Sequence, residues 1–182
     1  KGGVDGLESG VVLGASNAEL RLLGVENTGP GTYCTAIFNK GCSPRIFRVT
    51  ARASGGSYNS GIFNAQSAQP EINSVAAEAH GPATQNTGVY SILAQPVLAD
   101  VAAAASGADT NAGIHNFGVA VSLTRVSARA SGGEVAYGLY CNQTLGVMAF
   151  IDVSASGAAM NNYGLYLYNN ASPLIQDARI EV

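Results

Sequence analysis

The most regular feature of the chain is a three-residue motif of a small residue, an aliphatic residue and, in most copies, an aromatic residue. The motif returns in steps of 25 to 27 residues. Its seven copies are Gly10-Val11-Val12, Ala36-Ile37-Phe38, Gly61-Ile62-Phe63, Gly88-Val89-Tyr90, Gly113-Ile114-His115, Gly138-Leu139-Tyr140 and Gly164-Leu165-Tyr166. A fixed period of this length is typical of solenoid proteins, which stack one supersecondary unit per repeat. We therefore expect seven units, beginning near residues 10, 36, 61, 88, 113, 138 and 164.

A second apolar pattern follows each motif about ten residues later. In the second unit it consists of Ile46, Val49, Ala51 and Ala53, of which the last three alternate with other residues. Alternation with a period of two predicts a strand with one buried face, and the three-residue offset before it predicts a bend between two strands. Equivalent positions are assigned to Leu20, Leu23 and Val25 in the first unit, to Phe150, Val153 and Ala155 in the sixth, and to Ile175, Ala178, Ile180 and Val182 in the last.

Two kinds of corner divide each unit. Polar, glycine-rich corners such as Ser54-Gly55-Gly56 allow the backbone conformations that tight turns require. Proline recurs at another fixed position and suits the start of a strand, because it lacks the amide donor. These prolines are Pro44, Pro70, Pro96 and Pro173. Each unit therefore contains about three short strands and three corners, so we predict an all-β solenoid that forms one domain over residues 1–182.

Two phrases in the last unit resemble those of a known family. Asn161-Asn162-Tyr163-Gly164-Leu165-Tyr166 and Ala171-Ser172-Pro173-Leu174-Ile175 are similar to the recurrent "NYGIYN" and "SSPTI" phrases of surface proteins in the pectate-lyase-like superfamily. The resemblance extends over residues 10–182 and implies a right-handed parallel β-helix. It does not specify a function, since that superfamily contains polysaccharide lyases and hydrolases, phage tailspikes, adhesins and structural proteins.

Composition and charge exclude several classes of function. The net charge is −3 with nine scattered lysines and arginines, so the sequence lacks the basic patch that nucleic-acid binding needs. No apolar run approaches the roughly 18 residues of a membrane-spanning helix. The sequence has no initiator methionine and no signal-peptide pattern, so we expect a mature or trimmed product.

The residues that carry chemistry in enzymes are dispersed along the chain. Glycoside hydrolysis needs two carboxylates held about 5 to 10 Å apart, and the acidic residues here occupy different positions of the repeat. Glu71 and Asp100 come nearest to a shared position but lack a third partner. A lyase needs a calcium-binding acidic cluster and a base, and His80 and His115 have no metal-ligand spacing to cysteine or aspartate. We expect no enzymatic activity, no metal and no cofactor.

An aromatic position follows the aliphatic one in most units and, by strand alternation, points outward. Its members are Phe38, Phe63, Tyr90, His115, Tyr140 and Tyr166. Three interpretations remain open for this aromatic ladder: rings that stack on one another and stabilise the coils, a surface for lateral packing on another protein, and a surface for stacking on sugar rings.

The cysteines and the glycosylation sequons give weaker signals. Cys34 and Cys42 flank an extended segment of about 16 Å, which disfavours a disulfide unless Lys40-Gly41 folds the chain sharply back, and Cys141 lies several coils away. We expect all three thiols to be free. Asn142 and Asn170 begin Asn-X-Ser/Thr sequons in predicted surface turns and are candidate glycosylation sites if the protein is exported.

The ends of the repeat array suggest an assembly. Neither end carries a recognisable cap, and the last strand followed by Lys1-Gly2-Gly3 of a second copy continues the repeat pattern. The residues expected at such a head-to-tail interface are Lys1, Val11, Leu20, Leu23, Val25, Ala178, Ile180 and Val182. The competing explanation is a longer chain cut at the edge of a repeat.

The leading hypothesis is therefore an extracellular or cell-surface structural protein whose partner is itself, the subunit of a β-solenoid filament. A glycan-binding or glycan-cleaving β-helix, such as an adhesin or tailspike segment, is the alternative, with surface glycans as its partner. Ice binding requires a regular threonine ladder, and the threonines share no position across the units.

Overall fold

The computed structural model describes residues 10–182, which form twelve β-strands and no helix. The strands make two parallel layers. The front sheet contains β2 (Glu19–Asn27), β4 (Arg45–Ser54), the first halves of β6 (Glu71–Ile92) and β7 (Val97–Phe117), β8 (Ala120–Ser131), β10 (Leu145–Ser156) and β12 (Leu174–Glu181). The back sheet contains β1 (Gly10–Leu13), β3 (Tyr33–Lys40), β5 (Tyr58–Ala65), the second halves of β6 and β7, β9 (Val135–Asn142) and β11 (Asn161–Tyr168).

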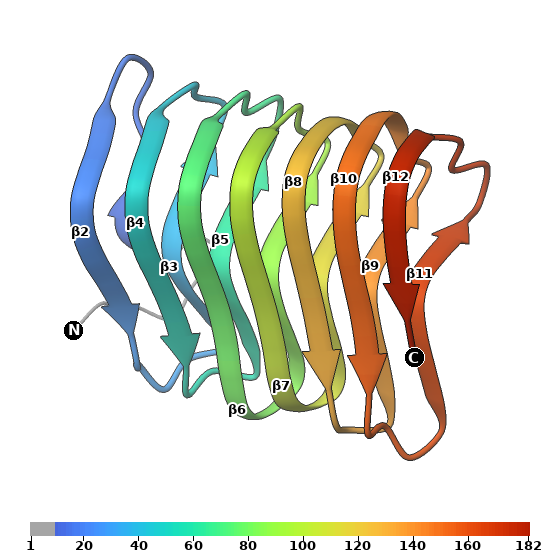
Figure 1. Cartoon of the computed structure of the whole chain (residues 1–182). Helices are drawn as coiled ribbons and strands as arrows, with labels where there is room; N and C mark the ends of the chain where they lie inside the picture. The colour runs from blue at the N-terminus through green and yellow to red at the C-terminus, as the bar shows by residue number, and fades with distance from the viewer. Residues whose placement is uncertain (1–9) are drawn as a thin grey trace.

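Each strand pairs in parallel with the equivalent strand one coil later. Ile62 of β5, for example, lies beside Val89 of β6, which lies beside Ile114 of β7. Front strands run downward and back strands upward while the chain advances from left to right in Figure 1, so the path is a right-handed solenoid of about seven turns. The predicted fold class is confirmed.

A bend divides every strand of the front sheet. One residue per coil adopts a positive φ there, between 50° and 55°, although none is glycine. These residues are Leu22, Arg48, Ser74, Asp100, Arg125, Phe150 and Asp177. Side chains with a Cβ adopt this left-handed conformation only rarely, so a stack of seven is a defining feature of the coil. The bend accounts for the three-residue offset, because Ile46 before it and Val49 after it both point into the core.

The pairing register corrects two assignments made from the sequence. In the first coil Val12 pairs with Ile37, so Val12 takes the aliphatic position that was assigned to Val11. In the sixth coil Met148 is fully buried in the core position, whereas Phe150 is the bend residue and is 58% exposed. The sequence pattern placed the phenyl group in the core because it is apolar, but the backbone ladder fixes the register.

The core lies between the two sheets and narrows at one edge. Columns of aliphatic side chains from both sheets fill its wide part, including Ile62 and Ile114 from the back and Ile72 from the front. At the narrow edge, an ideal Cβ on Gly113 would lie 2.5 Å from the backbone nitrogen of Arg129 in the front sheet. The small residue that opens the repeat motif is therefore needed because the two backbones almost touch.

Buried amides form columns of their own at the ends of the back strands. The Asn39 amide donates to Asn64 over 2.8 Å, and the Asn59 amide donates to Asn86 over 2.7 Å, in each case across one coil. Asn59 also accepts a hydrogen bond from the backbone nitrogen of Gly56 and so secures the preceding corner. These internal columns are a feature that the apolar repeat pattern did not predict.

Candidate functional site

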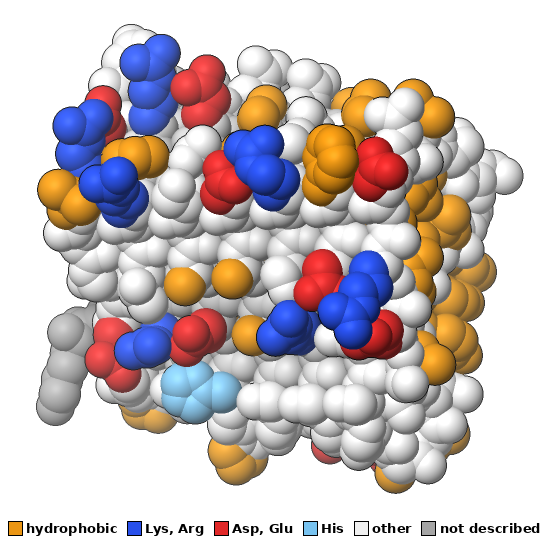
Figure 2. All heavy atoms as spheres, viewed as in Figure 1, with side chains coloured by type: hydrophobic (Ala, Val, Ile, Leu, Met, Phe, Trp, Pro, Cys, Tyr) orange, Lys and Arg blue, Asp and Glu red, His pale blue; other side chains and the backbone are white. Residues whose placement is uncertain are grey.

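The two sheets differ in the side chains that they carry, with tyrosines on the back sheet and most charged residues on the front sheet. All eight tyrosines belong to strands of the back sheet: Tyr33, Tyr58, Tyr90, Tyr137, Tyr140, Tyr163, Tyr166 and Tyr168. Most charged side chains of residues 10–182 belong to the front sheet, where Figure 2 shows them in two rows separated by a band of small side chains. Each face and each end of the coil stack therefore offers a different kind of candidate binding surface.

The aromatic ladder forms a continuous stack on the back sheet. Neighbouring ring centroids from Phe38 to Tyr166 lie 4.4 to 5.4 Å apart, which is the spacing of offset aromatic pairs. Phe38 is buried and the other members are half-buried. Burial lowers the pKa of His115 to about 4, so its imidazole is neutral at physiological pH and acts as one more ring in the stack.

Two further tyrosine groups flank this ladder. Near the first coils Tyr33 stacks on Tyr58 with centroids 5.3 Å apart. In the last coils Tyr137 stacks on Tyr163 at 5.3 Å, and Tyr163 contacts Tyr166 of the ladder at 4.8 Å. Neither group was visible in the sequence, because each interrupts a column whose other members are not aromatic.

A groove lies between the Tyr33–Tyr58 pair and the ladder. It encloses about 220 Å³, and no charged side chain of residues 10–182 lines it. Its lining residues are Tyr33, Thr35, Tyr58, Asn59, Ser60, Phe63, Gln85, Thr87 and Tyr90. In the sixth and seventh coils the position of Thr35 and Ser60 is taken by Tyr137 and Tyr163, so the groove is confined to the earlier coils. Aromatic walls over a hydroxyl-bearing floor suit a neutral ligand with both apolar and hydroxyl faces.

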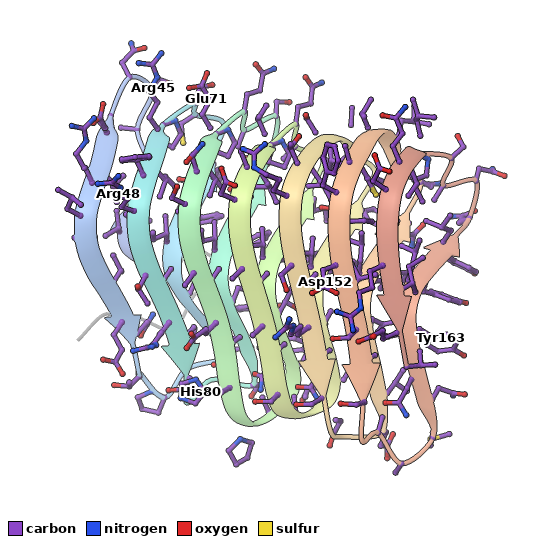
Figure 3. All side chains as sticks on the ribbon, viewed as in Figure 1. Arg45, Arg48, Glu71, His80, Asp152 and Tyr163 are labelled. Atoms are coloured by element: carbon purple, nitrogen blue, oxygen red, sulfur yellow. The ribbon has the colours of Figure 1, made fainter. Side chains whose placement is uncertain are left out.

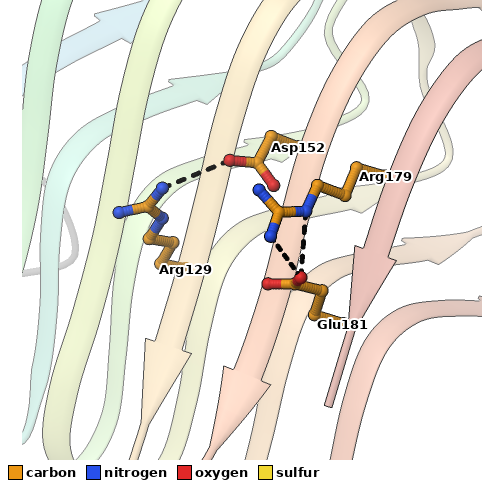
Figure 4. A network of polar contacts seen from close by, with 4 residues as sticks. All are labelled: Arg129, Asp152, Arg179 and Glu181. Carbon is orange, nitrogen blue, oxygen red and sulfur yellow. Dashed lines mark hydrogen bonds and ion pairs between the residues drawn. The ribbon is translucent and has the colours of Figure 1, made fainter.

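The front sheet pairs its charges across neighbouring coils. Arg52 lies 2.8 Å from Glu78, and Arg129 lies 3.2 Å from Asp152, as the close-up in Figure 4 shows for the second pair. Arg179 instead binds Glu181 within its own strand. Exposed pairs of this kind contribute less than about 1 kcal/mol each, so they favour the register of the coils more than their stability.

The two nearest catalytic candidates, Glu71 and Asp100, lie on neighbouring coils but three positions out of register, because Glu71 pairs with Val97. The Glu71 carboxylate lies 3.1 Å from Arg45 at the upper edge of the front sheet, as Figure 3 shows. Asp100 accepts two hydrogen bonds from Arg125, and hydrogen bonding to this guanidinium group lowers the pKa of its carboxyl group. Both carboxylates are therefore exposed, and each is ion-paired with an arginine.

The described part of the chain shows no cluster of metal-binding side chains, and its cysteines are buried. No group of three or more His, Cys, Asp or Glu side chains in residues 10–182 is placed to hold a metal ion. Cys34, Cys42 and Cys141 are free, as expected, and all are buried. Burial raises the pKa of the Cys141 thiol to about 12, which suppresses its nucleophilic thiolate form.

The head-to-tail residues lie at opposite ends of the stack. Ala178, Ile180 and Val182 are exposed on the last coil, where Figure 2 shows hydrophobic side chains down the right-hand end. On the first coil Leu20 is half-buried, Leu23 is exposed and Val25 is buried. Lys1 and the side chain of Val11 lie outside what the structure describes, and Val12 replaces Val11 in the stacked column.

The two sequons differ in accessibility. Asn142 is half-buried, and Thr144 is buried with its hydroxyl group donating to the carbonyl oxygen of Asn116. Asn170 and Ser172 are both exposed on the loop between β11 and β12. Of these two candidates, only Asn170 presents its sequon at the surface.

Residues 10–182 contain no helix that is long and apolar enough to cross a membrane. Comparisons of the chain with protein-family models, with curated proteins and with solved structures find no match.

Proposed function

We propose that this protein is a structural, non-enzymatic subunit of an extracellular filament, built by stacking solenoids end to end. One comparison of exposure carries the proposal. Val153 of β10 and Ile180 of β12 are neighbours in the same column, yet Val153 is fully buried and Ile180 is 50% exposed. A further coil laid on β12 would bury Ile180 as β12 buries Val153, and in the proposed filament a second copy provides that coil.

The first coil of a second copy has suitable side chains for this contact. Column by column, Ala178 would meet the exposed Leu23 of the partner subunit, and Ile180 would meet Val25, which is already buried in the single chain and adds little new buried area. Parallel backbone pairing would continue from β12 to the next front strand and set the direction of growth. Because the two contacting surfaces differ, the contact does not close on itself and generates a filament.

Electrostatics oppose the contact mildly. Glu181 shares its column with Glu26, so two carboxylates would become neighbours at the junction. Arg179 donates to Glu181 over 2.9 Å and partly neutralises it. Apolar burial, at about 25 cal/mol per Å², supplies the favourable term, whereas the carboxylates make assembly sensitive to salt.

The substitution Ile180→Lys tests the proposal. It places a charge in the seam, at a cost of several kcal/mol if the seam is buried. We expect the wild-type protein to form filaments with rising concentration in electron micrographs and sedimentation, and the variant to stay monomeric with an unchanged β-type circular dichroism spectrum. Leu93→Lys, at an exposed corner in the middle of the stack, is the matched control and should assemble normally. Filaments of the Ile180→Lys variant at the wild-type critical concentration would contradict the model.

A second candidate function, glycan binding, is favoured by the groove beside Tyr33 and Tyr58. The groove is sized for about one neutral sugar ring, with aromatic faces for its C–H groups and Thr and Gln side chains for its hydroxyls. Titration with neutral oligosaccharides should show binding that Tyr58→Ala abolishes and Tyr163→Ala, remote from the groove, retains. Equal binding by both variants, or none by the wild type, would reject this function.

A further inference from the structure

An exposed apolar patch lies on the front sheet in the sixth and seventh coils. It consists of Leu145, Val147, Phe150 and Leu174, each 43% to 58% exposed. In the column that contains Val147 and Leu174, the second and third coils carry the ion-paired Arg45 and Glu71. The column therefore changes from charged to apolar along the stack, and a local patch of this kind marks a contact surface.

Phe150, which ends the patch along β10, is locally unfavourable. It adopts a φ of 55° and exposes 58% of its surface, which combines a strained backbone with solvated apolar area. Asn, Asp and Gly adopt this conformation more readily, and Asp100 and Asp177 occupy the same position in other coils. Leu22 of the first coil shares the bend and is 68% exposed, so Phe150 is distinguished by the exposed apolar side chains that adjoin it on the sixth and seventh coils.

The charges beside the patch are arranged so that the surface complements itself. Arg125 precedes Phe150 by one coil in the bend column, and Asp177 follows it by one coil. Arg129 and Glu181 repeat this order in the lower row, on either side of Ser154. If a second copy faces the first with its coils running in the opposite direction and its sixth coil opposite the sixth coil of the first, each of these positive side chains faces a negative one.

We propose that this patch binds a second copy of the chain, side by side and antiparallel, about a two-fold axis at the sixth coil. Phe150 then packs on Phe150 of the partner subunit. Arg125, which is also ion-paired with Asp100 in its own chain, faces Asp177 of the partner subunit, and symmetry repeats that contact. Arg129 faces Glu181 of the partner subunit in the same way, while each keeps its partner within its own chain, Asp152 and Arg179 respectively. Four opposite-charge contacts therefore accompany the apolar patch.

One like-charge contact must be accommodated. Asp152 lies on the sixth coil and meets its symmetry mate across the axis. Arg129 binds Asp152 at 3.2 Å within the chain, so this carboxylate enters the contact already paired. The arrangement is independent of end-to-end stacking, because it uses the front face and leaves the core columns of the last coil untouched.

The test uses the full chain carrying Ile180→Lys, so that a lateral contact is measured without filament growth. We expect this protein to sediment as a dimer at high concentration. Phe150→Asn should abolish the dimer without lowering the melting temperature, because asparagine tolerates the left-handed backbone. Asp177→Arg should weaken the dimer about tenfold, because it replaces two opposite-charge pairs by repulsive ones. Glu134→Arg, an equal charge change at a corner of the back sheet, is the control and should leave dimerisation unchanged.

Symmetry gives a direct second readout. Val147 lies on the coil that contains the proposed axis, so Val147→Cys should form a disulfide-linked dimer on oxidation, while the native cysteines are buried. Ala104→Cys, exposed on the fourth coil, should not cross-link. A folded protein that stays monomeric at every concentration, including one whose patch binds a different macromolecule, would overturn the proposal. Dimerisation of Phe150→Asn at parental strength would overturn it as well.

Discussion

The substitution Gly113→Ala probes the close approach of the two sheets. The added methyl group would lie 2.5 Å from the Arg129 nitrogen and 2.7 Å from the Gly138 oxygen, both of which are backbone atoms. Neither can move aside as a flexible side chain would, so the sheets must separate locally. Overpacking of this kind costs about 1 to 3 kcal/mol, which corresponds to a melting temperature lower by about 2 to 12 °C for a chain of this size.

The matched control is Gly24→Ala in β2, where the added methyl group meets no atom within 4 Å. It should leave the melting temperature unchanged or raise it slightly, because alanine reduces the freedom of the unfolded chain. Gly61→Ala should fall between the two, since its nearest backbone atoms are 2.8 Å away. Thermal unfolding followed by circular dichroism measures all three. Equal melting temperatures for Gly113→Ala and Gly24→Ala would refute the argument that sheet contact imposes the repeat motif.

Four further predictions follow from burial and charge. The pKa of His115 falls to about 4 in the folded state, so the unfolded chain binds the proton more strongly; stability should decline by up to about 3 kcal/mol as pH falls from 6.5 to 4, and His115→Phe should flatten this dependence in denaturant titrations. The Cys141 thiol should react with Ellman's reagent at pH 8 only after unfolding, because burial raises its pKa to about 12; rapid reaction of the native protein would disprove its burial. Salt should promote end-to-end assembly by screening Glu181 from Glu26 of the next subunit, and light scattering that falls with added salt would argue against that junction. On secretion from eukaryotic cells, Asn170→Gln should remove any attached glycan seen by mass spectrometry, and a glycan on Asn142 would contradict the observed burial of its sequon.

Period and alternation were sufficient to predict the coil, because each buried column repeats one residue type at one spacing. The motif around Gly113 even reveals where the sheets touch, since only a small residue is tolerated there. Register was less certain at Val12 and Phe150. The sequence pattern assigned these core positions to Val11 and Phe150, whereas Val12 and Met148 hold them. Only the pairing of the backbones distinguishes these nearby apolar residues.

The candidate sites were predicted less completely than the fold. The stacked rings from Phe38 to Tyr166 recur at one position and are visible in the sequence, whereas the groove forms between columns that belong to different positions. The sequence also did not show that the side chain of Asn64 points into the core, because a polar residue in a strand is normally expected to face solvent. The patch at Phe150 depends on a backbone bend that no residue type signals by itself.

The axial spacing of subunits in an assembled filament tests the central proposal most directly. Seven coils at about 4.8 Å each give a subunit rise of about 34 Å along the axis. Helical reconstruction from electron micrographs should therefore show strands perpendicular to the axis at about 4.8 Å, unbroken across a junction that recurs about every 34 Å. A filament with any other subunit rise, or a protein that remains monomeric at the highest attainable concentration, would contradict end-to-end assembly.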